Sequence, residues 1–274
     1  MARLHHWLTP AVLAVGMAVP AAAQQDGSAP TIAFSDPSRP GRLRIELLHG
    51  TVTITGAERQ DVAIEVRRGG ENRPSNRPDP PGLKRLTQNP PFSVISEDDN
   101  EVRIQSASIT RPIELAIQVP LRTSLKLSVV NGDGIVVQGV EGDIEIESVN
   151  GPVSLVDVAG SVVANSVNAP VRATIARVAT QKAMAFTSFN GTVDVTLPRD
   201  IKASFKLRSD QGDVFTDFDI DLRPTQTPLT VESRRKGARY RLEANRAIYG
   251  TVGGGGPEIE LRSFNGDVYL RRGQ

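Results

Sequence analysis

The chain lacks cysteine and is poor in aromatic residues and histidine. None of its 274 residues is cysteine, 4% are aromatic and three are histidine. Without cysteine the chain can form neither a disulfide nor a thiolate metal site, and it has no cysteine nucleophile. A protein of this composition is therefore stabilised by packing and backbone pairing.

The scarcity of histidine excludes further chemistry. His5 and His6 lie within the first 23 residues, so His49 is the one histidine in the rest of the chain. A single histidine cannot make a histidine-rich zinc site. A Ser-His-Asp arrangement would have to use His49, and no G-x-S-x-G sequence presents a serine to it. We therefore expect neither an enzyme of these classes nor a bound cofactor or metal.

Long apolar runs are absent except near the start of the chain. The segment from Trp7 to Val19 is apolar, contains Pro10, and is followed by Ala21-Ala22-Ala23. This layout is typical of a secretory signal peptide with an A-x-A cleavage site. It is shorter than the roughly 20 residues of a membrane-spanning helix. We expect a cleaved signal peptide over residues 1–23, no transmembrane helix, no lipid-anchoring cysteine, and an exported protein in the periplasm or at the cell surface.

The chain beyond the leader has no net charge. The full chain has 32 basic and 31 acidic residues, and Arg3 is the only charged residue among residues 1–23, so 31 of each sign remain (32 − 1). A neutral chain lacks the general electrostatic attraction of a basic domain for nucleic acid. We therefore expect no nucleic-acid partner.

Composition divides the chain beyond the leader. Residues 24–40 are polar and proline-rich, which predicts a flexible lead-in. Alternating apolar and polar residues begin at Leu43 and continue in short segments. Residues 67–91 interrupt them with proline, glycine, arginine and asparagine and almost nothing to bury, which predicts a surface loop. The oligomeric state is not indicated.

A corner motif recurs through the second half of the chain. The hexapeptide SVNGPV at 148–153 returns as SVNAPV at 166–171. Related pairs recur at intervals of about 20 residues over most of this half, and only the last interval is much longer. The corner residues we single out are Asn131, Gly132, Asn150, Gly151, Asn168, Asn190, Gly191, Gly212, Asn265 and Gly266.

This repeat predicts an all-β chain. Period-two alternation places one side of each strand inward, so we expect Val153, Leu155, Val171, Val193 and Val195 in the core. Asn-Gly pairs tolerate positive φ at a sharp turn. Repeats of about 20 residues made of short strands are typical of a single-chain β-solenoid (β-helix), whose turns stabilise one another by stacking. We expect such a domain over residues 41–272, with its Ser and Asn corners aligned in ladders; a β-sandwich is the competing fold.

The long last interval, from Gly212 to Gly266, requires its own explanation. It contains two alternating runs, 227–233 and 238–245, on either side of Arg235-Lys236-Gly237. This pattern predicts a β-hairpin insertion over residues 225–250. A hairpin there would cover the open edge of the last turn.

Several segments together resemble a known family. They are a strand ending in Val119-Pro120 with the G-x-I/V strands after it, SFNGTVDVTLP at 188–198, and GGGGPEIELRSFNGDVYLRR at 253–272. In combination they resemble the bacterial putative-adhesin family, a group of envelope domains of unknown function. The resemblance covers residues 41–272. It implies a β-solenoid in an exported bacterial protein and brings no catalytic residues with it.

Three segments carry candidate sites. The acidic segment has Asp217, Asp219 and Asp221 at alternate positions, which predicts that they share one face of an extended strand. This pattern indicates acid–base chemistry on a sugar, a calcium site, or a solvated face opposite Phe218, Ile220 and Leu222. Gly253–Gly256 lacks the Lys-Ser/Thr of a phosphate loop and indicates a turn. A basic cluster is typical of a solvated hairpin tip or of a site for an anionic polymer; it contains Arg234, Arg235, Lys236, Arg239 and Arg241.

These observations favour one function and leave two alternatives. The leading hypothesis is an exported, non-enzymatic β-solenoid that acts as a cell-envelope scaffold or an adhesin-like binding surface, with an envelope protein or polysaccharide as partner. The first alternative is a polysaccharide-acting enzyme that uses the acidic segment 217–221. The second is an envelope signalling or interaction domain that binds a protein partner by strand addition.

Overall fold

The computed structural model describes residues 31–68, 94–106, 112–223, 230–231, 242–243 and 247–273. Within these ranges the chain forms 22 strands and no helix, which confirms the all-β class. None of the described residues therefore forms a helix that could cross a membrane. Twenty strands form one continuous hydrogen-bonded sheet, and β18 (Thr230–Val231) pairs separately with β19 (Leu242–Glu243).

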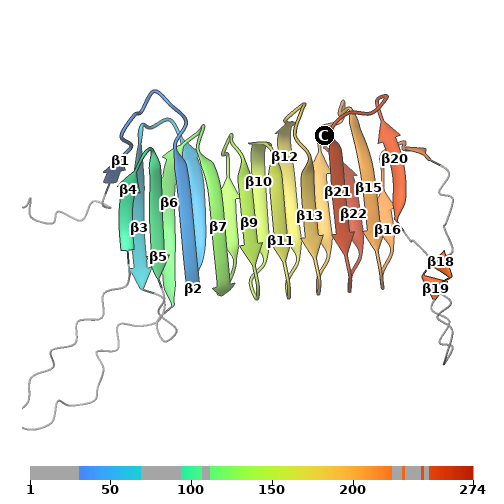
Figure 1. Ribbon diagram of the computed structural model, residues 1–274, viewed down its shortest axis with the longest axis horizontal. Coiled ribbons are helices and arrows are strands. Elements are labelled where there is room, and N and C mark those ends of the chain that lie inside the picture. The colour runs from blue at the N-terminus through green and yellow to red at the C-terminus, as the bar shows by residue number, and fades with distance from the viewer. Residues whose placement is uncertain are drawn as a thin grey trace, which may run out of the picture.

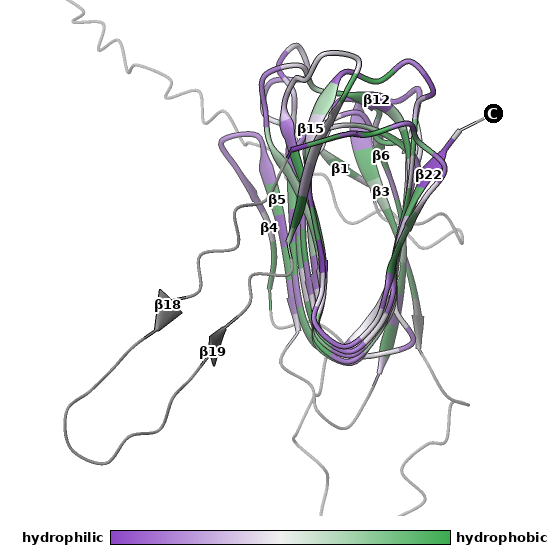
Figure 2. Ribbon diagram, turned by 90° about the vertical axis from the view of Figure 1, so that its right-hand side faces the viewer, coloured by the Kyte–Doolittle hydropathy of each residue, from purple (hydrophilic) through white to green (hydrophobic). Residues whose placement is uncertain are grey.

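The continuous sheet is bent into two opposing walls, here named face A and face B, which enclose the core (Figure 2). The two walls are connected through the long strand β2 (Arg42–Ala57), whose first half belongs to face B and second half to face A. In spatial order face A consists of β1 (Thr31–Ala33), β3 (Asp61–Arg68), β6 (Ile113–Pro120), β2, β8 (Ile135–Gln138), β10 (Val153–Gly160), β12 (Val171–Val178), β14 (Val193–Leu197), β22 (Val268–Arg272) and β16 (Val214–Thr216). Face B consists of β4 (Val94–Asp98), β5 (Glu101–Ser106), β2, β7 (Ser124–Asn131), β9 (Ile144–Ser148), β11 (Val162–Ser166), β13 (Met184–Ser188), β21 (Glu258–Ser263), β15 (Ala203–Ser209), β20 (Ile248–Val252) and β17 (Asp221–Leu222).

From β7 to β14 the chain alternates between the two faces, and each strand pairs in parallel with the strand two places along (Figure 1). On face A, Val153 lies opposite Ile135 on one side and Val171 on the other. The two copies of the duplicated hexapeptide therefore occupy the same place in adjacent turns of the chain.

Alternation along each strand builds the core. The five residues predicted to point inward, Val153, Leu155, Val171, Val193 and Val195, are each at most 1% exposed, which confirms the inward phase. Burying one such side chain contributes about 1.5–3 kcal/mol relative to leaving it in water. Because the core is a column of these residues, each turn covers the apolar surface of the turn beside it.

Two turns are not in chain order. The first is β2, which lies between the turn formed by β5 and β6 and the turn formed by β7 and β8. The second is formed by β21 and β22, which lie between the turn of β13 and β14 and the turn of β15 and β16. The long interval between Gly212 and Gly266 therefore arises because the last turn of the chain returns into the stack.

Antiparallel strands close both ends of the stack. At one end β3 pairs with β6, β1 pairs with β3, and β4 pairs with β5. At the other end β20 pairs with β15, and β17 pairs with β20. Within the hairpin expected at 225–250 the structure describes β18, β19 and the start of β20. The edge of β15 is covered by β20 and then β17, whereas β18 and β19 pair with each other.

A loop at residues 34–41 is fixed to the β4–β5 turn. The side-chain amide of the buried Asn100 donates to the carbonyls of Asp36 (3.0 Å) and Arg39 (3.2 Å) and accepts the Asp36 N–H (2.8 Å). The Glu97 carboxylate accepts both the N–H (3.0 Å) and the hydroxyl (2.7 Å) of Ser35. We call these contacts the N-terminal clasp. Residues 31–40 of the expected lead-in thus form β1 and this loop.

Several predicted segments lie outside the described residues. They are the signal peptide at 1–23, residues 24–30 of the lead-in, residues 69–91 of the proline-rich loop, and the basic cluster at 234–241.

Candidate binding surface

Asparagine side chains form a ladder at the corner where the chain passes from face B to face A. The side-chain amide of each donates to the side-chain oxygen of the next: Asn150 to Asn131 (2.6 Å), Asn168 to Asn150 (2.7 Å), Asn190 to Asn168 (2.8 Å) and Asn265 to Asn190 (2.7 Å). All five are exposed. The expected asparagine ladder is therefore present, and it includes Asn265 because the last turn is inserted beside Asn190.

A serine at the end of each face B strand in this region forms a second, buried column. Ser188 donates to the carbonyl of Ala169 (2.9 Å), Ser263 to that of Gly191 (2.8 Å) and Ser209 to that of Gly266 (2.8 Å). These three hydroxyls each satisfy a carbonyl of the neighbouring turn, which would cost about 1–3 kcal/mol if left unpaired, whereas Ser148 donates to the carbonyl of Gly151 in its own turn.

The corner glycines are needed for a different reason than the sequence suggested. We expected positive φ, but in the described residues the left-handed glycines are Gly134, Gly139, Gly160, Gly253, Gly254 and Gly255, and no corner asparagine or glycine is among the positive-φ residues. Close approach of turns is the cause. A Cβ added at Gly191 would lie 2.6 Å from the carbonyl carbon of Ala169. The predicted corners Gly132, Gly151, Gly212 and Gly266 likewise approach the backbone of an adjacent turn.

Between the serine and the asparagine lies a column of apolar side chains that points outward. Phe189 is 48% exposed and Val167 is 43% exposed. The rings of Phe189 and Phe264 are stacked, with centroids 4.7 Å apart and planes at 3°. We call this apolar column together with the asparagine ladder the ridge; it consists of Val130, Val149, Val167, Phe189, Phe264, Asn131, Asn150, Asn168, Asn190 and Asn265.

A second aromatic pair lies on the outer side of face A. Phe215 of β16 and Tyr269 of β22 are in register, with ring centroids 5.2 Å apart and planes at 13°. Phe215 is 48% exposed. The guanidinium of Arg271 lies 5.1 Å from the centre of the Tyr269 ring. We call Phe215, Tyr269 and Arg271 the platform.

Neighbouring carboxylates hold the platform in place. Asp194 accepts two hydrogen bonds from Arg271, at 2.7 and 3.2 Å, and this contact raises the pKa of the guanidinium further. Asp267 accepts the hydroxyl of Tyr269 at 3.0 Å, which is the main reason that the pKa of Tyr269 is raised above its ordinary value of 10.0. The Tyr269 hydroxyl is thus held by Asp267, and its ring contacts both Phe215 and Arg271.

The acidic segment is not one extended strand. The chain leaves face A after β16 and reaches face B at β17, so Asp217 and Asp219 lie in the connection and Asp221 begins β17. All three are exposed, and Asp217 accepts the Arg272 N–H at 2.7 Å. Phe218 is buried as expected, whereas Leu222 is 65% exposed and does not point inward. The prediction of a single strand face was wrong because β17 pairs with β20 rather than extending β16.

The remaining predicted positions, His49 and Gly253–Gly256, lie in a strand and in a connection between strands. His49 lies in β2 opposite Asn131, at the level of the asparagine ladder. Gly253–Gly256 connects β20 to β21, with three of the four glycines at positive φ. Across the described parts of the chain, no three histidine, aspartate or glutamate side chains are grouped so that they could hold a metal ion.

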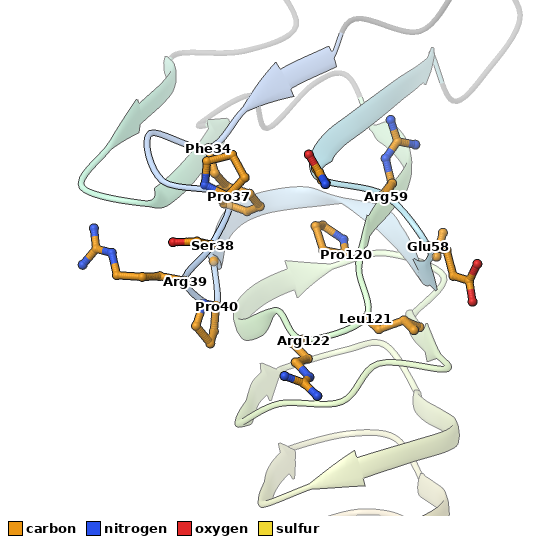
Figure 3. A pocket seen from close by; sticks show the side chains of 13 residues that line it. Phe34, Pro37, Ser38, Arg39, Pro40, Glu58, Arg59, Pro120, Leu121 and Arg122 are labelled. Carbon is orange, nitrogen blue, oxygen red and sulfur yellow. The ribbon is translucent and has the colours of Figure 1, made fainter.

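A cleft of about 350 Å³ lies at the opposite edge, near the N-terminal clasp (Figure 3). Three arginines line it. Arg39 pairs with Asp36 (2.9 Å) and Arg59 with Asp61 (2.6 Å), whereas Arg122 is exposed and forms no ion pair among the described residues. Because two of its three cations are neutralised by adjacent carboxylates, the cleft is a weaker candidate for an anion than its arginines suggest.

Sequence reasoning missed both aromatic pairs. A direct indication was present for the first, since Ser-Phe-Asn-Gly occurs at 188–191 and again at 263–266, and identical corners mark adjacent turns. For the second, the indication was an aromatic residue at the outward position of two short strands, Phe215 and Tyr269.

Comparison with known proteins provides little further information. No family model matches the chain, and no curated protein matches it. The crystal structure of a putative cell adhesion protein from Clostridium sporogenes aligns over 89% of this chain and 100% of its own, with a TM-score of 0.38 and 12% sequence identity. A likeness this distant assigns neither a family nor a function, so the resemblance to the bacterial adhesin family stays an expectation from the sequence.

Proposed function

We propose that the protein is an exported, non-enzymatic β-solenoid with turns of about 20 residues, which acts as a cell-envelope scaffold or an adhesin-like binding surface. In-register parallel pairing on both faces supports the solenoid, because an antiparallel Greek-key sandwich would not place identical corners of successive turns above one another. The Asn ladder through five turns supports the same architecture.

Exposed aromatic rings on a rigid frame are the observation that carries the binding role. Among the described residues, the aromatic side chains that reach the surface are Phe189, Phe215, Tyr249, Phe264 and Tyr269. Four of them form the two stacked pairs of the ridge and the platform, on three adjacent turns. Exposed apolar groups gathered in one region of a surface mark an interaction site more often than single exposed residues do.

The absence of catalysis is the second part of the proposal. The exposed carboxylates Asp217, Asp219 and Asp221 do not converge on one face, and Asp217 accepts a backbone N–H. General acid–base catalysis needs groups that converge on the reacting atoms in surroundings that tune their proton affinity. Export is supported by the leader-like sequence of residues 1–23.

Binding to isolated cell envelopes tests this function. We expect the protein without residues 1–23 to co-sediment saturably with envelopes, and the double variant Phe189→Ala/Phe215→Ala to lose most of this binding. Val163→Ala is the matched control, because Val163 is an exposed apolar residue of face B that belongs to neither aromatic pair. Absence of saturable binding by the unmodified protein would contradict the proposal.

An enzymatic assay separates the main alternative. The protein is incubated with envelope glycans beside the triple variant Asp217→Asn/Asp219→Asn/Asp221→Asn. We expect no glycan fragments from either. Release of fragments by the unmodified protein, absent in a variant with the same thermal unfolding curve, would establish the enzyme instead.

A further inference from the structure

The platform has a geometry suited to one class of ligand. Phe215 contacts Tyr269 through one ring face, and β16 is the last strand of face A in the described part of the chain. No further described strand therefore lies in register against the other face of Phe215, and the side chain is 48% exposed. The result is an aromatic ring held at a fixed angle with room beside it.

Two carboxylates flank Phe215 along the chain. Asp213 and Asp217 lie two residues before and after Phe215, and both are exposed. Asp267 links the two sides of the platform, because it accepts the Tyr269 hydroxyl and the Asp213 N–H, each at 3.0 Å. Carboxylates are strong acceptors with two oxygens each, so they can bind donors on a ligand as well as these groups.

We propose that the platform binds a pyranose glycan without anionic groups, either uncharged or amine-bearing. A pyranose ring presents a face of C–H bonds that packs on an aromatic ring, while its hydroxyls lie at the rim and donate to carboxylates. The free face of Phe215 provides the aromatic surface, Tyr269 supports that ring from its other side, and Asp213 and Asp217 provide the acceptors. This inference rests on the proposed binding function and names the ligand of one part of that surface.

Charge determines which glycans fit. Four carboxylates lie at the platform, Asp194, Asp213, Asp217 and Asp267, against two guanidinium groups, Arg271 and Arg272, a balance of −2 (2 − 4). Arg271 is already paired with Asp194. An anionic glycan would meet like charges, which disfavours it. The ridge has a weaker rim: Phe189 lies between Val167 and Phe264, and the carboxylate next to Phe264, that of Asp210, is paired with Arg208 and Arg262.

Calorimetric titration with soluble oligosaccharides of equal length tests the assignment. The probes are a chitosan oligosaccharide, its N-acetylated form and an oligogalacturonate. We expect the first two to bind and the oligogalacturonate not to. Phe215→Ala lowers the affinity about tenfold, equivalent to about 1.4 kcal/mol. Phe215→Leu, which keeps an apolar side chain but removes the ring, gives a similar loss and excludes unfolding as the cause.

The control is Phe189→Ala, since Phe189 is also 48% exposed and also one of a stacked pair. We expect it to bind the oligosaccharides as the unmodified protein does. Asp213→Asn reduces the preference for the amine-bearing probe over the acetylated one about threefold. Equal affinity of Phe215→Ala and the unmodified protein, equal losses in Phe215→Ala and Phe189→Ala, or preferred binding of the oligogalacturonate would overturn the assignment.

The two proposals fail separately. If the unmodified protein binds envelopes but none of the oligosaccharides, the binding function stands and the glycan assignment is wrong. If Phe215→Ala loses an envelope protein partner while oligosaccharide affinity is unchanged, the platform binds a protein by strand addition at β16, and the glycan assignment is again wrong. If the protein does not bind envelopes at all, the binding function itself is wrong.

Discussion

The two long edges of the stack are built in different ways. At the ridge, connections of equal length recur at 149–152, 167–170, 189–192, 210–213 and 264–267. In all of them except 210–213, where Gln211 takes the place of asparagine, the asparagine side chain bonds to that of the neighbouring turn. At the opposite edge, here called the far edge, the connections at 139–143, 161, 179–183 and 198–202 vary in length. Their side-chain contacts differ from turn to turn, such as Lys182 with Asp143 at 2.6 Å and Arg177 with Glu141 at 3.1 Å.

This difference between the edges explains where the clefts of the molecule lie. Repeated corners bring the backbones of adjacent turns close together along the ridge. Irregular connections at the far edge leave the cleft near the N-terminal clasp and a second one of about 460 Å³ beside Arg177, Ile201 and Pro257. The ridge is thus the regular edge of the stack. Substitutions at the two edges test whether the ridge also contributes more to the free energy of unfolding.

The largest effect is expected in the core beneath both edges. Val193→Asp places an unpaired charge at a fully buried position and should cost more than about 4 kcal/mol, which in practice unfolds the domain. Asp194→Ala, one residue along, removes an exposed ion pair with Arg271 and should cost at most about 1 kcal/mol. Urea denaturation measures both, and similar midpoints would show that the inward phase is wrong.

A smaller loss is expected from glycine replacement at the ridge. Gly191→Ala forces a methyl group to within 2.6 Å of the Ala169 backbone and should cost about 2–3 kcal/mol. The far-edge control is Gly254→Ala, where no atom lies within 4 Å of the added methyl but φ is +83°. Left-handed strain there should cost about 1–2 kcal/mol. A Gly191 variant as stable as the Gly254 variant would disprove the close approach.

The asparagine ladder should contribute less again. Asn168→Ala removes two inter-turn hydrogen bonds and should cost about 1–2 kcal/mol, while Asn131→Ala removes one and should cost about half as much. Lys182→Ala at the far edge removes an exposed ion pair and should cost no more than about 0.5 kcal/mol. If Lys182→Ala were the most damaging of the three, the ridge would not be the more stabilising edge.

The smallest effect concerns pH at the N-terminal clasp. Hydrogen bonds from the hydroxyl and then the N–H of Ser35 hold the pKa of Glu97 below its ordinary value of 4.5. The folded state therefore favours the ionised form of Glu97. The contribution of this carboxylate to the free energy of unfolding is complete above pH 4.5 and is lost as pH falls through the lower pKa of the folded state. Glu97→Gln should be less stable than the unmodified protein at pH 7, with the difference vanishing in acid. If the difference in unfolding free energy between the two proteins did not change with pH, the Glu97 carboxylate would not be the source of the stabilisation.

Much of the regular region was predictable from the sequence, because there each turn repeats the same local requirements. Alternation identified Val153 and Leu155 as inward, and the recurring Ser-x-Asn-Gly identified the ladder. The reason that the corners require glycine was not predictable. It is the short distance between the backbones of adjacent turns, not a positive φ at the corner.

The order of the turns could not be read from local patterns. Pairing of Arg42 with both Glu101 and Ser124, or of Met184 with Ile259, joins segments far apart in the sequence, and nothing within either segment specifies its neighbour. The acidic segment was misread for the same reason, because Asp221 pairs across to β20. Repeated short sequences, such as Ser-Phe-Asn-Gly at 188–191 and 263–266, are the feature that indicates which distant segments lie in adjacent turns.

The inserted last turn also sets the order in which the molecule can fold. The slot between β13–β14 and β15–β16 is filled by residues 258–272, so the stack cannot close until the final residues of the sequence are available. Such long-range pairing makes folding slow. For the export proposed above this delay is useful, since a complete core cannot form before residues 258–272 have crossed the membrane.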